Sequence, residues 1–155
     1  MNDLWDNAKN LPIQVGGQIT GGFDIGFDDE ISEETREALM RFVYWVEDHY
    51  ALPVTLWVDF KYRHYLVTQD KRRVGYKFYW ADFATWPFFE NPDDVPVIEL
   101  PVRTEQSSMD DILRSFIQGI TCYYLWLSNL DVKGCETDET MAASILAAYR
   151  KWEKL

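Results

Sequence analysis

A chain of 155 residues is the size of a single domain and is long enough to bury a hydrophobic core. Its 15 Lys and Arg residues against 26 Asp and Glu residues give a formal net charge of −11. This balance argues against nucleic-acid or membrane binding, because affinity for phosphates and anionic lipids comes from cationic side chains. The aromatic fraction of 16% supplies large rings for a core or for a contact surface. We expect a protein partner, of basic character, or a homo-oligomer.

Residues 1–31 are predicted to form an N-terminal arm or short strands that belong to the same domain as residues 32–155. Short alternating apolar runs flank the sequence GGQITGG at positions 16–22. These glycines lack the spacing and the Lys-Ser/Thr pair of a phosphate-binding loop, so they are interpreted as turn residues.

The N-terminus has no basic region followed by an apolar run, so no secretory signal is predicted and a cytoplasmic location is expected. The two cysteines, Cys122 and Cys135, are thirteen positions apart and form no CxxC motif. In a reducing compartment they are expected to be free thiols.

Three main helices are predicted from capping residues and apolar periodicity. Ser32 is a good N-cap for a helix over about 33–50, whose apolar residues recur on one face. Ser108 begins a second helix over 109–127, which is apolar on most sides and is therefore expected to be central and buried. Thr137 is expected to cap the last helix.

The strands are predicted from period-2 alternation of apolar residues at 54–60 and 74–80, with a polar turn at 69–72. Residues 95–102 resume strand character, and their two prolines favour a short or edge strand. The fold class predicted is α+β: an antiparallel or mixed sheet of about four to five strands, covered by three main helices, in one domain.

The residues predicted to bind a partner or ligand are aromatic or lie beside aromatic residues. Trp86, Phe88 and Phe89 fall in a proline-containing segment and are predicted to form a contact surface. The alternative is that the three rings fold back onto the sheet and close the core, because large apolar residues are usually buried. Trp57 and His64 belong to the predicted sheet segment and are candidates for lining an aromatic pocket.

No catalytic residue is assigned from the sequence, and no metal or cofactor is predicted. Only two histidines occur, His49 and His64, and they lack the paired spacing of zinc ligands. Acidic clusters lack the spacing of a calcium loop. They are interpreted as solvated faces and helix caps.

The order helix, strands, edge strand and apolar helix resembles that of small zincin-like metallopeptidases. In that family the helix after the edge strand carries HExxH, which places two imidazoles on zinc. Here the corresponding segment 117–121 reads IQGIT and has neither histidine nor glutamate. The resemblance therefore implies at most a relative that lacks the HExxH motif.

The leading functional hypothesis is a non-enzymatic protein-binding or regulatory domain. The alternatives are a small-molecule-binding enzyme with an aromatic pocket near His64, and the zincin-like relative without its zinc ligands. The position of His64 and of carboxylates such as Asp59 and Glu99 distinguishes these hypotheses. A deep pocket that contains His64 and a carboxylate would favour the enzyme, and a flat aromatic patch without a cavity would favour the protein-binding domain.

Overall fold

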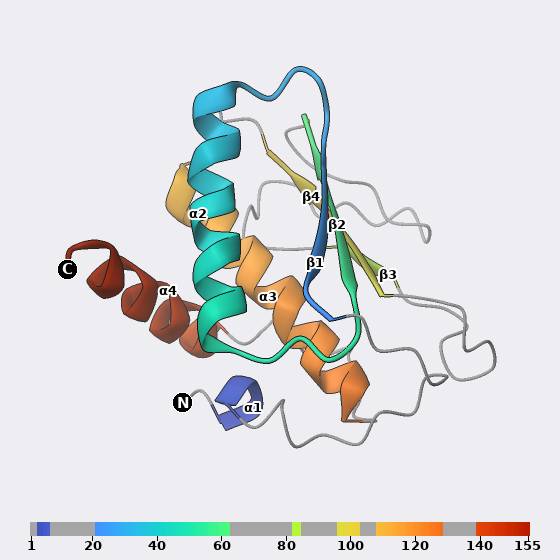
Figure 1. The fold of residues 1–155 in the computed structure, drawn as a ribbon, viewed down its shortest axis with the longest axis vertical. Helices are drawn as coiled ribbons and strands as arrows, with labels where there is room; N and C mark the ends of the chain where they lie inside the picture. Colours follow the sequence, from blue (N-terminus) through green and yellow to red (C-terminus); the bar gives the residue numbers. More distant parts are fainter. Residues whose placement is uncertain (1–2, 7–20, 63–81, 85–95, 103–107, 129–138) are drawn as a thin grey trace.

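The computed structural model describes residues 3–6, 21–62, 82–84, 96–102, 108–128 and 139–155. Their strands form one sheet, and the helices over Glu33–His49 and Met109–Leu127 lie on the same side of it (Figure 1). The order of elements is α1 (Asp3–Asp6), β1 (Phe23–Phe27), α2 (Glu33–His49), β2 (Leu56–Lys61), β3 (Asp82–Ala84), β4 (Val97–Pro101), α3 (Met109–Leu127) and α4 (Glu139–Glu153).

The sheet has the strand order β1-β2-β4-β3, and its three longer strands run parallel. Ile25 of β1 is in register with Val58 of β2, which is in register with Ile98 of β4. Only the three-residue strand β3 runs antiparallel, at the edge beyond β4.

The predicted antiparallel or mixed sheet of four to five strands is therefore wrong, because the body of the sheet is three parallel strands. The α+β class and the three main helices are confirmed. The physical reason for the error is that α2 carries the chain back along the sheet, so β2 starts at the same end as β1. Apolar alternation does not distinguish the two strand directions. The predicted strand 74–80 and turn 69–72 lie outside the described residues.

Two prolines lie at the ends of β4, where their missing N–H groups interrupt no hydrogen bond in the middle of the strand. Pro101 is the last residue of the strand, and Pro96 precedes its first residue and accepts a hydrogen bond from the Trp57 backbone N–H at 3.0 Å. β4 is thus short, as predicted, but it lies between β2 and β3 rather than at an edge.

Two of the three predicted helix caps are present, and the third, Thr137, lies outside the described residues. The Ser32 Oγ accepts a hydrogen bond from the Thr35 N–H at 3.2 Å, and the Ser108 Oγ accepts one from the Asp111 N–H at 3.1 Å. These contacts satisfy N–H groups that have no partner inside the helix, which explains why α2 and α3 begin at the next residue in each case.

The predicted burial of α3 is confirmed, since 14 of its 19 residues are buried. At its centre the Phe116 ring lies 5.4 Å from that of Phe42 on α2 and 5.3 Å from that of Phe60 on β2, between ring centroids. One ring thus joins two helices to the sheet. The rings of Phe42 and Tyr149, 5.0 Å apart, add α4 to the same core.

Two buried tyrosines of α3 form hydrogen bonds with the backbone of the segment that leads into β2. The Tyr123 hydroxyl donates to the Val54 carbonyl and accepts from the Val54 N–H at 3.0 Å. The Tyr124 hydroxyl donates to the Ala51 carbonyl at 2.7 Å. Burial raises the pKa of both hydroxyls far above the ordinary value of 10.0, because the phenolate would lose its hydration.

The expectation of free thiols is wrong for Cys122, which is buried in α3 and forms a disulfide. The other cysteine of the sequence, Cys135, lies outside the described residues. In the part of the chain that the structure describes, no helix has the length and apolar character needed to cross a lipid bilayer.

Candidate binding surface

Among the strands that the structure describes, β1 has a neighbour in the sheet on one side only, so it is an edge strand of this sheet. The Gly22 carbonyl accepts a hydrogen bond from the Leu56 N–H at 3.0 Å, and the Asp28 N–H donates to the Phe60 carbonyl at 2.9 Å. In a parallel ladder the residues that bond one neighbour alternate along the strand. Phe23, Ile25 and Phe27, which are on the other parity, therefore direct their backbone groups away from β2.

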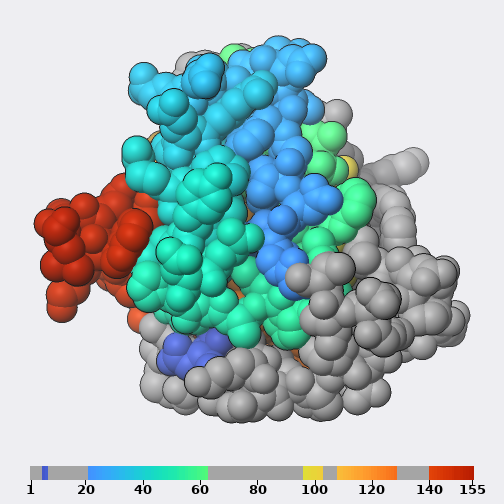
Figure 2. Space-filling view, in the orientation of Figure 1, coloured from blue at the N-terminus to red at the C-terminus, as the bar shows by residue number. Residues whose placement is uncertain are grey.

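The helix α2 runs alongside this free edge. At one end the Arg36 guanidinium lies 5.4 Å from the centre of the Phe27 ring. At the other end a Glu47 carboxylate oxygen accepts the outward N–H of Phe23 at 3.0 Å. The earlier helix residue contacts the later strand residue and the later helix residue contacts the earlier one, so the helix and the strand run in opposite directions. Figure 2 shows the two elements next to each other on one open face of the molecule.

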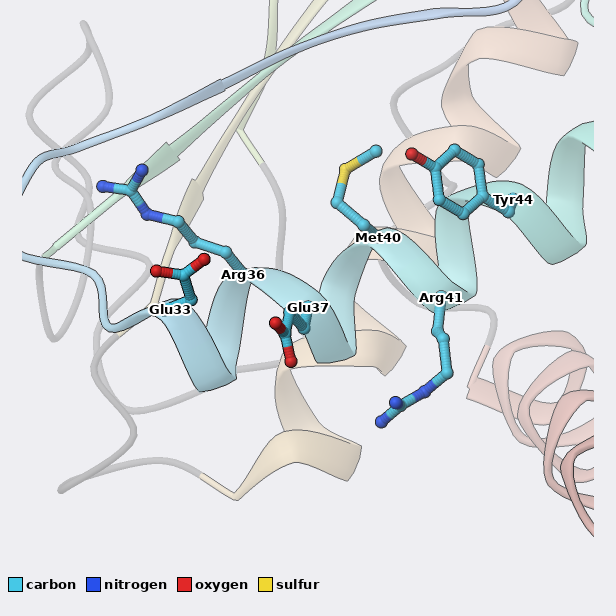
Figure 3. Close-up of a pocket in the computed structure, with 6 residues that line it drawn as sticks. All are labelled: Glu33, Arg36, Glu37, Met40, Arg41 and Tyr44. Atoms are coloured by element: carbon cyan, nitrogen blue, oxygen red, sulfur yellow. The ribbon is translucent and has the colours of Figure 1, made fainter.

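Between these two contacts α2 carries Met40 and Tyr44 on nearly the same side, because residues four apart are neighbours on a helix. Figure 3 shows Arg36, Met40 and Tyr44 pointing to one side of α2, and Arg41 pointing to the other. Met40 is partly buried against the core, whereas 57% of Tyr44 is exposed. We name the free edge of β1 together with Arg36, Met40, Tyr44 and Glu47 the β1–α2 surface.

A hollow of about 430 Å³ lies on the same helix (Figure 3). It is lined by Glu33, Arg36, Glu37, Met40, Arg41 and Tyr44. All six residues belong to α2, so the hollow is open to solvent and is not a pocket closed by several elements. Such a shape fits contact with another chain better than enclosure of a small ligand.

The other face of the sheet carries Trp57, of which 45% is exposed. The strand register brings Asp59 of β2 directly beside Glu99 of β4, two residues whose relative position the sequence left open. Asp24 of β1 is in register with Trp57 and is also exposed. This face therefore combines an exposed indole with carboxylates.

The remaining predicted site residues, His64, Trp86, Phe88 and Phe89, lie outside the described residues, and their contact surface stays a prediction. Among the residues that are described, no group of three or more His, Cys, Asp or Glu side chains could hold a metal ion. Sequence reasoning missed Tyr44 and the edge of β1. The signal for Tyr44 was its place beside the apolar stripe of the predicted helix, whereas edge position leaves no local pattern.

Comparisons of this chain with protein-family models, with curated proteins and with solved structures each found no match.

Proposed function

We propose that this protein is a non-enzymatic protein-binding domain, and that its binding site is the β1–α2 surface. The observation that carries the proposal is the exposed Tyr44 ring beside the edge of β1, where the outward backbone groups of Ile25 and Phe27 meet no partner among the described residues. Tyrosine contributes a large contact area with few rotatable bonds, and it is enriched at the centres of protein interfaces.

The scaffold beneath this surface supports the proposal. The side chains of Phe23, Ile25 and Phe27 pack against the core, and Val43 of α2 is buried next to Met40. A binding surface held by packed side chains loses little conformational entropy on association, so more of the contact energy is left for affinity.

The test is selection from a phage-displayed library of random peptides on the immobilised protein. Selected peptides are then titrated against the wild-type protein, Tyr44→Ser and Trp152→Ser. Trp152 is the matched control, because it is another exposed aromatic residue, 37% exposed, but belongs to α4.

We expect Tyr44→Ser to weaken binding at least about tenfold, the loss of one interface anchor, and Trp152→Ser to leave it unchanged. Circular dichroism and thermal unfolding of each variant verify that the fold is kept. Peptides that bind Tyr44→Ser as tightly as wild type, or a selection that enriches nothing, would contradict the proposal.

The alternative of a small-molecule-binding enzyme has one observation in its favour, the register of Asp59 and Glu99 on the face that carries Trp57. A fragment library screened by ligand-observed NMR against wild type and Trp57→Ala tests it. Fragments that bind wild type and are lost in Trp57→Ala would favour the enzyme hypothesis.

A further inference from the structure

We propose that the partner binds as an extended segment that adds a strand to the free edge of β1. Apolar and basic residues would alternate along this segment, with the apolar side chains facing α2 and the basic side chains on the opposite face of the sheet. This inference rests on the proposed function and specifies the class of ligand that the β1–α2 surface takes.

The first argument is the hydrogen-bonding capacity of the edge. The Phe23 N–H donates to Glu47, whereas the outward backbone groups of Ile25 and Phe27 meet no hydrogen-bond partner among the residues that the structure describes. The Ile25 N–H and C=O and the Phe27 N–H are thus available to an added strand. Unpaired edges of this kind pair readily with another chain, and main-chain hydrogen bonds then supply affinity.

The second argument concerns the side of the added strand that faces α2. Side chains of a strand alternate between the two faces of a sheet, so every second residue of the ligand would lie beside the α2 row. Met40 and Tyr44 supply the apolar side chains of this row, between the charged Arg36 and Glu47 at the two ends. Apolar side chains at alternate ligand positions fit this row.

The third argument concerns the opposite face. Asp24 is exposed on it, and an Asp59 carboxylate oxygen lies only 2.8 Å from where a Cβ on Gly26 would be placed. This carboxylate therefore leans over β1 toward the free edge. Two acidic groups beside the added strand favour Lys or Arg at the intervening ligand positions.

A second copy of this chain is a poorer occupant of the edge. Each copy carries a net charge of −11, so association works against mutual repulsion. If two β1 strands paired antiparallel about Ile25, both Asp24 side chains would lie on the same face as diagonal neighbours. A basic segment meets neither obstacle.

The test uses amide hydrogen exchange of the ¹⁵N-labelled protein with a seven-residue peptide of alternating lysine and valine, blocked at both ends. The control peptide has glutamate in place of lysine. In the free protein we expect the Ile25 and Phe27 amides to exchange at least about 100-fold faster than the Gly26 amide, which bonds β2. The lysine peptide should slow both outward amides at least about tenfold, and the glutamate peptide should not.

Asp24→Asn should weaken the lysine peptide several-fold while leaving thermal unfolding unchanged. If neither peptide slows the exchange of Ile25 and Phe27, strand addition is wrong. The proposed function still stands in that case provided that selected peptides depend on Tyr44. If both amides are protected without peptide and sedimentation shows a dimer, a second copy occupies the edge and the inference is overturned.

Discussion

The substitution Tyr123→Phe isolates the hydrogen bonds that connect α3 to the start of β2. Phenylalanine keeps the ring in its fully buried site but removes the hydroxyl, which both donates to and accepts from the backbone of Val54. Val54 is only 5% exposed, so water does not replace the lost partner. An unsatisfied buried polar group costs about 1–3 kcal/mol, and two are created here, so we expect a loss of about 2–6 kcal/mol in the free energy of unfolding.

Urea unfolding followed by far-UV circular dichroism measures this loss, and Tyr149→Phe is the matched control. The Tyr149 ring is also buried, but its hydroxyl donates to the Glu153 carboxylate at 3.1 Å, which keeps Arg150 as a partner. We expect that variant to lose about 1 kcal/mol or less. Equal losses for the two variants would refute the reasoning, because the cost would then come from the hydroxyl itself and not from the stranded backbone groups.

Three further outcomes are expected. Phe116→Ala should lower the free energy of unfolding by about 3–5 kcal/mol, because the ring is fully buried among aromatic neighbours. Phe27→Ala should lower it clearly less, because Phe27 is only partly buried. Equal urea midpoints for the two variants would contradict the central position of α3. Because burial raises the pKa of Tyr123 and Tyr124 above the unfolded value of 10.0, their contribution is fully present below about pH 10 and is lost as the pH rises beyond it. The free energy of unfolding should therefore be lower at pH 11 than at pH 8, and equal values at the two pH values would contradict this cause. Ser32→Ala should lower the free energy of unfolding by about 1 kcal/mol, because the hydrogen bond that caps the Thr35 N–H is lost. Ser32→Asp should restore it, since aspartate is also a good N-cap. An unchanged urea midpoint for Ser32→Ala would show that the cap is not stabilising.

The sequence by itself determined α2 and α3 well, because the forces that begin and end a helix act within a few residues. Ser32 and Ser108 cap the first turns, and the apolar character of 109–127 predicted both the bounds and the burial of α3. Trp45 shows the limit of this reasoning. The apolar stripe predicted for 33–50 consists of Leu39, Phe42, Val43, Val46 and Tyr50 and does not include it. It is nevertheless buried, because α4 brings the Tyr149 ring centroid to within 5.3 Å of its own.

Strand direction, strand neighbours and the proposed binding surface were decided only by the tertiary structure. Alternation in β1 and β2 predicts which side chains face the core, but it is the same for parallel and antiparallel pairing. Which strand ends up at the edge depends on the path of the connecting helix, and so does the exposure of Tyr44 beside it. A free edge is a set of backbone groups that lack a partner, and every residue carries those groups, so no side-chain pattern in the sequence records where they remain unpaired.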